Sequence, residues 1–197
     1  VGNSLEVVEA IEFLKGNLDN GDLAEVTYSI AAMTLLQLDL YDNISEASAY
    51  LKNLVHSGKA LEKFRELIIA QGGAAEVIDN YDKFTLPCYK VECESKKNGY
   101  IQNINAHNVS CAVKALGAAR ENSSKPIDLS VGIFLNKKSG EYVKKGEILY
   151  TIYSNNEDAT KIAQRYCDEA FSINETRPSH NNLIYKIIST KDEDDNV

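Results

Sequence analysis

The stretch VGIFLNKKSGEYVKKGEILYTIYS, residues 131–154, decides the fold of the second half of this chain. Two of its glycines, Gly140 and Gly146, bracket Val143, and an apolar run stands on either side of them. Short apolar runs separated by glycine-containing turns are typical of β-hairpins. The phrase NGYIQNI at 98–104 looks like the first half of the same unit. The sequence therefore predicts a compact β unit after about residue 88.

Composition limits the classes of protein to which the chain can belong. The chain has 197 residues, of which 44% are hydrophobic and 25% are charged, as expected for a globular protein of one or two domains. Its net charge of −8 disfavours nucleic acid and anionic membranes as partners. No apolar run approaches the ~20 residues that span a bilayer, and no signal peptide is recognised. We therefore expect a cytoplasmic protein.

Two further features concern the cysteines and the first residue. The four cysteines form no C-x-x-C pair, so a zinc site is not expected and the thiols are interpreted as reduced packing residues. The chain begins at Val1 without an initiator methionine. We therefore expect it to be a piece of a longer protein.

Residues 1–80 carry apolar side chains at helical spacing and no strand pattern. Capping residues followed by acidic side chains mark the starts of helices, and glycines mark their ends. Four helices are expected, beginning at Asn3, Asp22, Ser45 and about Lys59, with glycines 16, 58 and 72 closing the first, third and fourth.

The pattern changes near residues 80–88, which we take as the boundary between two halves. Apolar and charged residues alternate from Tyr89, the two-residue period of a half-buried strand. The elements expected after it are a strand around Ile101–Ile104, a helix at 108–116, a loop at RENSSKP (120–126), the hairpin, a helix at 158–171, a last strand at Leu183–Ile188 and a disordered acidic tail at 191–197.

The hairpin phrase is similar to the G-x-x-V-x-x-G phrase of lipoyl and biotinyl carrier domains, which present a modified lysine at a turn. Lys137 and Lys138 lie near such a turn, but no E-A-M-K or D-K-A phrase surrounds them. Carrier domains also have no room for helices at 108–116 and 158–171. The two lysines are therefore interpreted as a solvated edge of the sheet, and the β unit as part of a larger α+β domain.

Four phrases resemble the pyrimidine-nucleoside and thymidine phosphorylases. They are VGNSLEVVEAIEFLKGN (1–17), SGKALEKFRELIIAQGG (57–73), KNGYIQNINAHNVSCAVKALGAAR (97–120) and PIDLSVGIFLNKKSGEYVKKGEILYTIYS (126–154). They follow one another in the order and at the spacing of that family. Any one of them is weak evidence, whereas the four together are strong.

The resemblance implies that this chain is the C-terminal part of a much longer one. Residues 1–80 would be the closing helices of the family's central α/β domain. Residues 88–190 would be its C-terminal α/β-hammerhead domain, with a barrel-sandwich-like hairpin, and 191–197 a disordered tail. The resemblance thus implies an α+β fold, and a homodimer formed through segments absent from this chain.

The family cleaves a pyrimidine nucleoside with phosphate, giving the free base and a pentose 1-phosphate in nucleoside salvage. This transferase chemistry needs a phosphate cradle and cationic groups that hold the base. In the family these residues lie upstream of the present segment, and no K-x-S-x-G-like loop occurs here. His56, His107 and His180 are isolated, so no catalytic or substrate-binding residue is assigned.

One site residue carries over from the family, whose bacterial members bind a monovalent cation, potassium, through backbone carbonyls and one glutamate. The resemblance places that glutamate at Glu9, the last residue of the L-E-V-x-E phrase. A hard cation takes oxygen ligands, and one carboxylate offsets its charge. The alternative is that Glu9 is a solvated helix residue. No cofactor is expected to be required for this chain to fold.

Two functional hypotheses remain open from the sequence. In the first, the chain is the C-terminal portion of a pyrimidine-nucleoside phosphorylase and is inactive alone. In the second, it is a stand-alone, non-catalytic hammerhead module used for binding or carrying. The coding sequence upstream of Val1 distinguishes them, because only the enzyme requires a phosphate loop there.

Overall fold

The computed structural model describes residues 1–120, 126–179 and 182–188. The predicted loop at 121–125, His180 and the predicted tail at 191–197 lie outside these described residues. The chain divides into two compact units. The first combines Val1–Ile11 with Arg65–Ser179, and the second contains Glu12–Phe64 and the described residues 182–188.

Four helices occupy residues 3–70, as the sequence predicts. They are α1 (Asn3–Leu14), α2 (Asp22–Gln37), α3 (Ile44–His56) and α4 (Lys59–Ala70), followed by the 3-10 turns η1 (Ala75–Ile78) and η2 (Tyr81–Lys83). In the second unit, α2 packs on α3 around a small core in which the rings of Phe13 and Tyr28 are 5.4 Å apart. Gly16, at φ 81°, terminates α1, and its amide donates to the Phe13 carbonyl.

The predicted caps of two helices are wrong. α3 begins one residue before Ser45, and its N-cap is Asn43, whose Oδ1 accepts from the Glu46 amide at 2.9 Å. Asn3 is the first residue of α1 and not its cap. The Asn3 side-chain amide donates instead to the carbonyl of Ala118, which lies beside the start of the helix.

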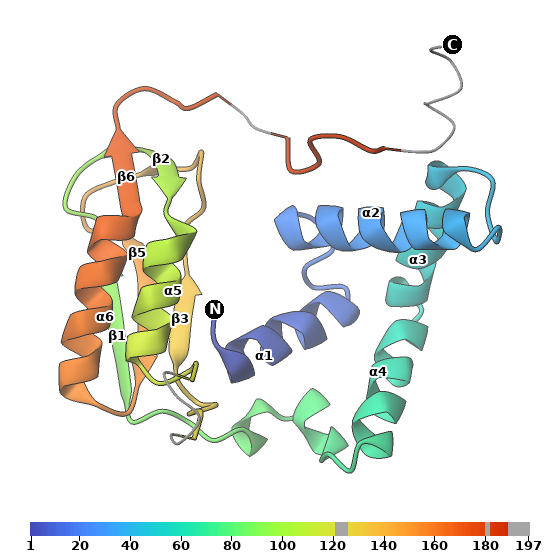
Figure 1. Ribbon diagram of the computed structural model, residues 1–197, viewed down its shortest axis with the longest axis horizontal. Coiled ribbons are helices and arrows are strands. Elements are labelled where there is room, and N and C mark those ends of the chain that lie inside the picture. The colour runs from blue at the N-terminus through green and yellow to red at the C-terminus, as the bar shows by residue number, and fades with distance from the viewer. Residues whose placement is uncertain (121–125, 180–181, 189–197) are drawn as a thin grey trace. The chain divides into compact units, whose positions relative to one another are not determined.

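The second half of the chain forms two antiparallel sheets of three strands (Figure 1). One sheet has the order β1-β5-β3 and the other β4-β2-β6. Their bounds are β1 Tyr89–Glu94, β2 Gly99–Ile104, β3 Gly132–Leu135, β4 Tyr142–Val143, β5 Ile148–Ser154 and β6 Phe171–Asn174. Together with the helices, these sheets confirm the expected α+β class.

The stretch 131–154 divides its strands between the two sheets. β3 pairs with β5, with Ile133 opposite Ile152. The two-residue strand β4 lies between them in sequence but pairs with β2 of the other sheet, with Val143 opposite Gly99. Gly140 and Gly146, at φ 88° and 89°, lie in the turns on either side of β4, where glycine readily adopts a positive φ.

Helices α5 (Ala106–Ala115) and α6 (Glu157–Ala170) lie side by side against the sheets (Figure 1). Asn105 caps α5, and Asn156 caps α6. One core joins these helices to the sheets. Its fully buried members include Ile101, Val131, Ile133, Val143, Tyr150, Ile152, Ala163 and Cys167.

The predicted last strand at Leu183–Ile188 is wrong. Residues 182–188 contain neither helix nor strand, and Tyr185 is 85% exposed. The run has β-branched residues but pairs with no strand, so its backbone joins no ladder. The sixth strand is instead β6, which follows α6 directly and pairs with β2. Within the described part of the chain, no helix is both long and apolar enough to cross a membrane.

Candidate functional site

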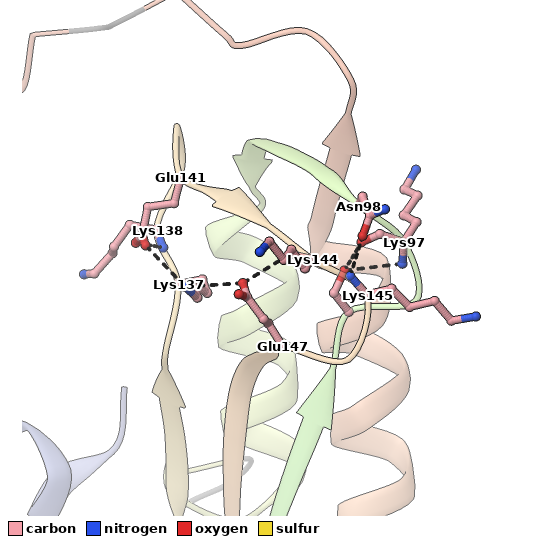
Figure 2. A network of polar contacts seen from close by, with 9 residues as sticks. Lys97, Asn98, Lys137, Lys138, Glu141, Lys144, Lys145 and Glu147 are labelled. Atoms are coloured by element: carbon pink, nitrogen blue, oxygen red, sulfur yellow. Dashed lines mark hydrogen bonds and ion pairs between the residues drawn. The ribbon is translucent and has the colours of Figure 1, made fainter.

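The lysine-rich hairpin, defined as residues 137–147, is fixed by its own carboxylates (Figure 2). The Lys137 ammonium lies 3.9 Å from Glu141 and 3.6 Å from Glu147. Glu141 also accepts from the Lys138 backbone amide at 2.7 Å, and Glu147 from that of Lys144 at 3.1 Å. Each glutamate therefore closes the turn that precedes it.

This geometry differs from that of a carrier lysine. Lys137 is only 27% exposed and contacts two carboxylates, so its side chain packs along the hairpin. Lys138 is exposed, but its amide takes part in the turn. Figure 2 shows Lys145 beside the β1–β2 turn, where its amide donates to Asn98 at 2.8 Å. The turn between β4 and β5 is thus bonded to the β1–β2 turn.

A second polar cluster lies beneath a hollow between β1, the β1–β2 turn and α6. The Tyr150 hydroxyl donates to Asp168 at 2.7 Å, and Lys96 pairs with the other oxygen of Asp168 at 2.7 Å. Burial and the hydrogen bond to Asp168 raise the pKa of Tyr150 well above its ordinary value. The phenol therefore stays protonated and joins β5 to α6, which is a packing role.

The cysteines are free thiols, as the sequence predicts. Burial raises the pKa of Cys93, and it raises that of Cys167 to about 12. Neither thiol is available as a thiolate near neutral pH. Cys111 is half-buried, with its sulfur 3.6 Å from Nε2 of His107. Cys88 is exposed.

His56 also has a local partner, since its Nε2 lies 2.8 Å from Asp19 at the surface of the second unit. Among the residues that the structure describes, no three histidine, cysteine or acidic side chains gather as a metal cluster.

Glu9 lies on α1 with an exposed side chain. It belongs to the unit that contains the sheets, because Val1–Ile11 clusters with that unit. Within the described ranges no hydrogen bond or ion pair engages its carboxylate. An exposed carboxylate is the kind of oxygen group that a hard cation binds.

Comparison with known proteins gives one consistent result. Residues 100–174 match the family model described as pyrimidine nucleoside phosphorylase C-terminal domain. The pyrimidine-nucleoside phosphorylase of Staphylococcus epidermidis strain ATCC 12228 is 38% identical over 189 residues. That of Staphylococcus aureus strain USA300 is 37% identical over 189 residues.

Both alignments cover 96% of this chain but only 43% of each relative, so the chain spans less than half of their length. The region that matches the C-terminal domain begins at Tyr100 in β2 and ends at Asn174, the last residue of β6. It thus contains helices α5 and α6 and the strands from β2 onward. Residues 100–174 thus match a pyrimidine nucleoside phosphorylase C-terminal domain, and the chain is similar to the C-terminal part of the phosphorylases of that name.

Proposed function

We propose that this chain is the C-terminal portion of a pyrimidine-nucleoside phosphorylase. In the proposed reaction an oxygen of phosphate attacks C1′ of the pentose, and the electrons of the glycosidic bond leave with the base. The products are the free base and a pentose 1-phosphate. The observation that carries the proposal is the alignment over 96% of the chain with enzymes of that name.

The chain's own contribution to this reaction is structural. Its sequence has no K-x-S-x-G-like loop for phosphate. The thiol of Cys111 lies 3.6 Å from Nε2 of His107, but no third group is described that would orient this histidine as a base. The groups that bind phosphate and pyrimidine would then lie in the remainder of a longer protein. Nucleoside salvage in the cytoplasm, a homodimer, and thymidine or uridine as substrates are parts of the same proposal.

The proposal includes a potassium ion bound by Glu9 in the longer protein. A bound cation would neutralise the carboxylate and hold the α1 helix against the carbonyl groups that complete its coordination. This role rests on the family resemblance and on the free, exposed carboxylate of Glu9.

Substituting Glu9 tests this role. Glu9→Gln keeps an oxygen but removes the charge, so we expect potassium to raise the melting temperature of the longer protein less than in the wild type. Glu6→Gln is the matched control on the same helix, because Glu6 already accepts from the Gly2 amide at 3.2 Å. Equal potassium responses in the wild type and in Glu9→Gln would show that the assignment is wrong.

The coding sequence upstream of Val1 provides the first test of the function itself. An open reading frame that encodes a glycine- and serine-rich phosphate loop supports the enzyme. An immediate start codon supports the non-catalytic module instead.

A further inference from the structure

The first residue of the chain pairs with β3, which lies far from it in the sequence. The Val1 nitrogen donates to the Ile133 carbonyl at 2.6 Å, and the Ile133 amide donates to the Val1 carbonyl at 2.7 Å. Two reciprocal bonds between the same two residues are the pattern of a hydrogen-bonded antiparallel pair. Val1 thus adds a single bridge to the edge of the β1-β5-β3 sheet.

Two glycines allow the backbones to approach this closely. A Cβ on Gly2 would lie 2.7 Å from the Val131 carbonyl oxygen and 2.8 Å from Cα of Gly132. A Cβ on Gly132 would lie 2.6 Å from the Val1 carbonyl oxygen. Gly2 also has φ 130°, which side chains rarely adopt. The Gly2–Gly132 crossing, defined as the close approach of these two backbones, therefore cannot hold a larger residue at either position unless the backbone moves.

The first turn of α1 is bound to the same domain immediately after the crossing. The Ser4 amide and hydroxyl both donate to the Leu129 carbonyl, at 3.1 and 2.7 Å. The Asn3 side-chain amide donates to the Ala118 carbonyl at 3.0 Å. Amides at a helix start have no partner within the helix, and here the C-terminal domain supplies one. These bonds fix both the position and the rotation of the helix start.

We propose that the Gly2–Gly132 crossing makes the C-terminal domain the scaffold that positions Glu9. Glu9 lies about two helical turns, roughly 10 Å, along the same helix from Gly2. Because a helix of this length is stiff, the orientation fixed at Gly2 is transmitted to the carboxylate. Gly2, Asn3, Ser4 and Gly132 are then positioning residues for a cation ligand. This inference rests on the proposed cation site.

Hydrogen exchange on the 197-residue chain tests the scaffold without any cation. The reporter is the Ile133 amide, which donates to Val1, and the reference is the Ile101 amide of the other sheet, which donates to Glu141. In Gly132→Ala, we expect exchange at Ile133 to become at least about tenfold faster than in the wild type, whereas exchange at Ile101 stays the same. Gly99→Ala is the matched control, since its Cβ would also lie 2.6 Å from a carbonyl oxygen, that of Asn174. It should affect Ile101 and spare Ile133.

A second variant covers the case in which Gly132→Ala fails to fold. The double substitution Asn3→Ala and Ser4→Ala removes two side-chain bonds to the C-terminal domain without introducing a clash. It should also speed exchange at Ile133. Unchanged exchange at Ile133 in this variant would overturn the scaffold.

Potassium titration of the longer protein tests the link to Glu9. The potassium concentration that gives half of the rise in melting temperature should increase about tenfold in Gly132→Ala and in the double variant, and should stay constant in Gly99→Ala. Loss of the response in Glu9→Gln but not in the crossing variants would overturn this inference and leave the proposed cation site intact. A wild type that does not respond to potassium would overturn both.

Discussion

Purified residues 1–197 are expected to release no free base from thymidine or uridine in the presence of phosphate. Without a phosphate loop the attacking oxygen is neither bound nor oriented, and such positioning supplies ~7–11 kcal/mol of barrier reduction. Without cationic groups at the base, nothing stabilises the negative charge that develops on the leaving pyrimidine. Losing even one such donor typically lowers the rate by a factor of about 10²–10³. These losses together place turnover below detection.

The assay follows the free base by chromatography, with a buffer control and a preparation from host cells that lack the chain. Host phosphorylases are the main source of false activity, so the protein is purified a second time and assayed again. Turnover that exceeds the control and survives this step would mean that the active site has been misplaced.

The same chemical change at two buried tyrosines is expected to affect stability differently: one substitution destabilises the protein and the other does not. Tyr150→Phe removes a hydroxyl that donates to the Asp168 carboxylate at 2.7 Å and contacts the Gln164 carbonyl at 3.3 Å. Hydrogen bonds to charged groups contribute ~1.5–3 kcal/mol. We therefore expect the free energy of unfolding of the sheet-containing unit to fall by about that amount.

Tyr28 is 7% exposed, and its hydroxyl has no partner among the residues that the structure describes. A buried, unsatisfied hydroxyl costs ~1–3 kcal/mol. Tyr28→Phe is therefore expected to be neutral or stabilising, while its ring keeps the contact with Phe13.

Native-state hydrogen exchange separates the two tyrosine effects, with amides of β5 reporting on Tyr150 and amides of α2 on Tyr28. Comparable destabilisation by both substitutions would contradict the hydrogen-bond assignment, because loss of the hydroxyl would then have the same effect whether or not it donates to a partner.

Local signals predicted the helices and most strands. Apolar residues at helical spacing, closed by glycines such as Gly16, identify α1 to α4. These elements depend on contacts between neighbouring residues, which the sequence displays directly. The caps were less predictable, because Asn3 has the right chemistry for a cap but lies inside the helix, where its side-chain amide donates to the Ala118 carbonyl.

Strand pairing depends on distant residues, and the sequence alone was a poorer guide to it. Phe171–Asn174 has no turn between it and α6, so nothing marks it as a strand until β2 is seen beside it. The run 183–188 has the composition of a strand but no partner strand. In the same way, Gly2 and Gly132 are ordinary glycines in sequence, and only the fold shows that their backbones cross.

The candidate site could be named from the sequence only through the family resemblance. Nothing in the local pattern separates Glu9 from the other exposed glutamates of α1, such as Glu6. What the structure adds is the attachment of this helix start to the C-terminal domain at Val1 and Ile133. That attachment joins residues 132 positions apart in the sequence, so no local motif could reveal it.

The most direct test of the central claim is the phosphorolysis assay of the longer protein encoded by the complete reading frame. With uridine or thymidine, we expect free base and pentose 1-phosphate to appear in equal amounts and only when phosphate is present. No release from any pyrimidine nucleoside, or release that does not depend on phosphate, would contradict the assignment of this chain to a pyrimidine-nucleoside phosphorylase.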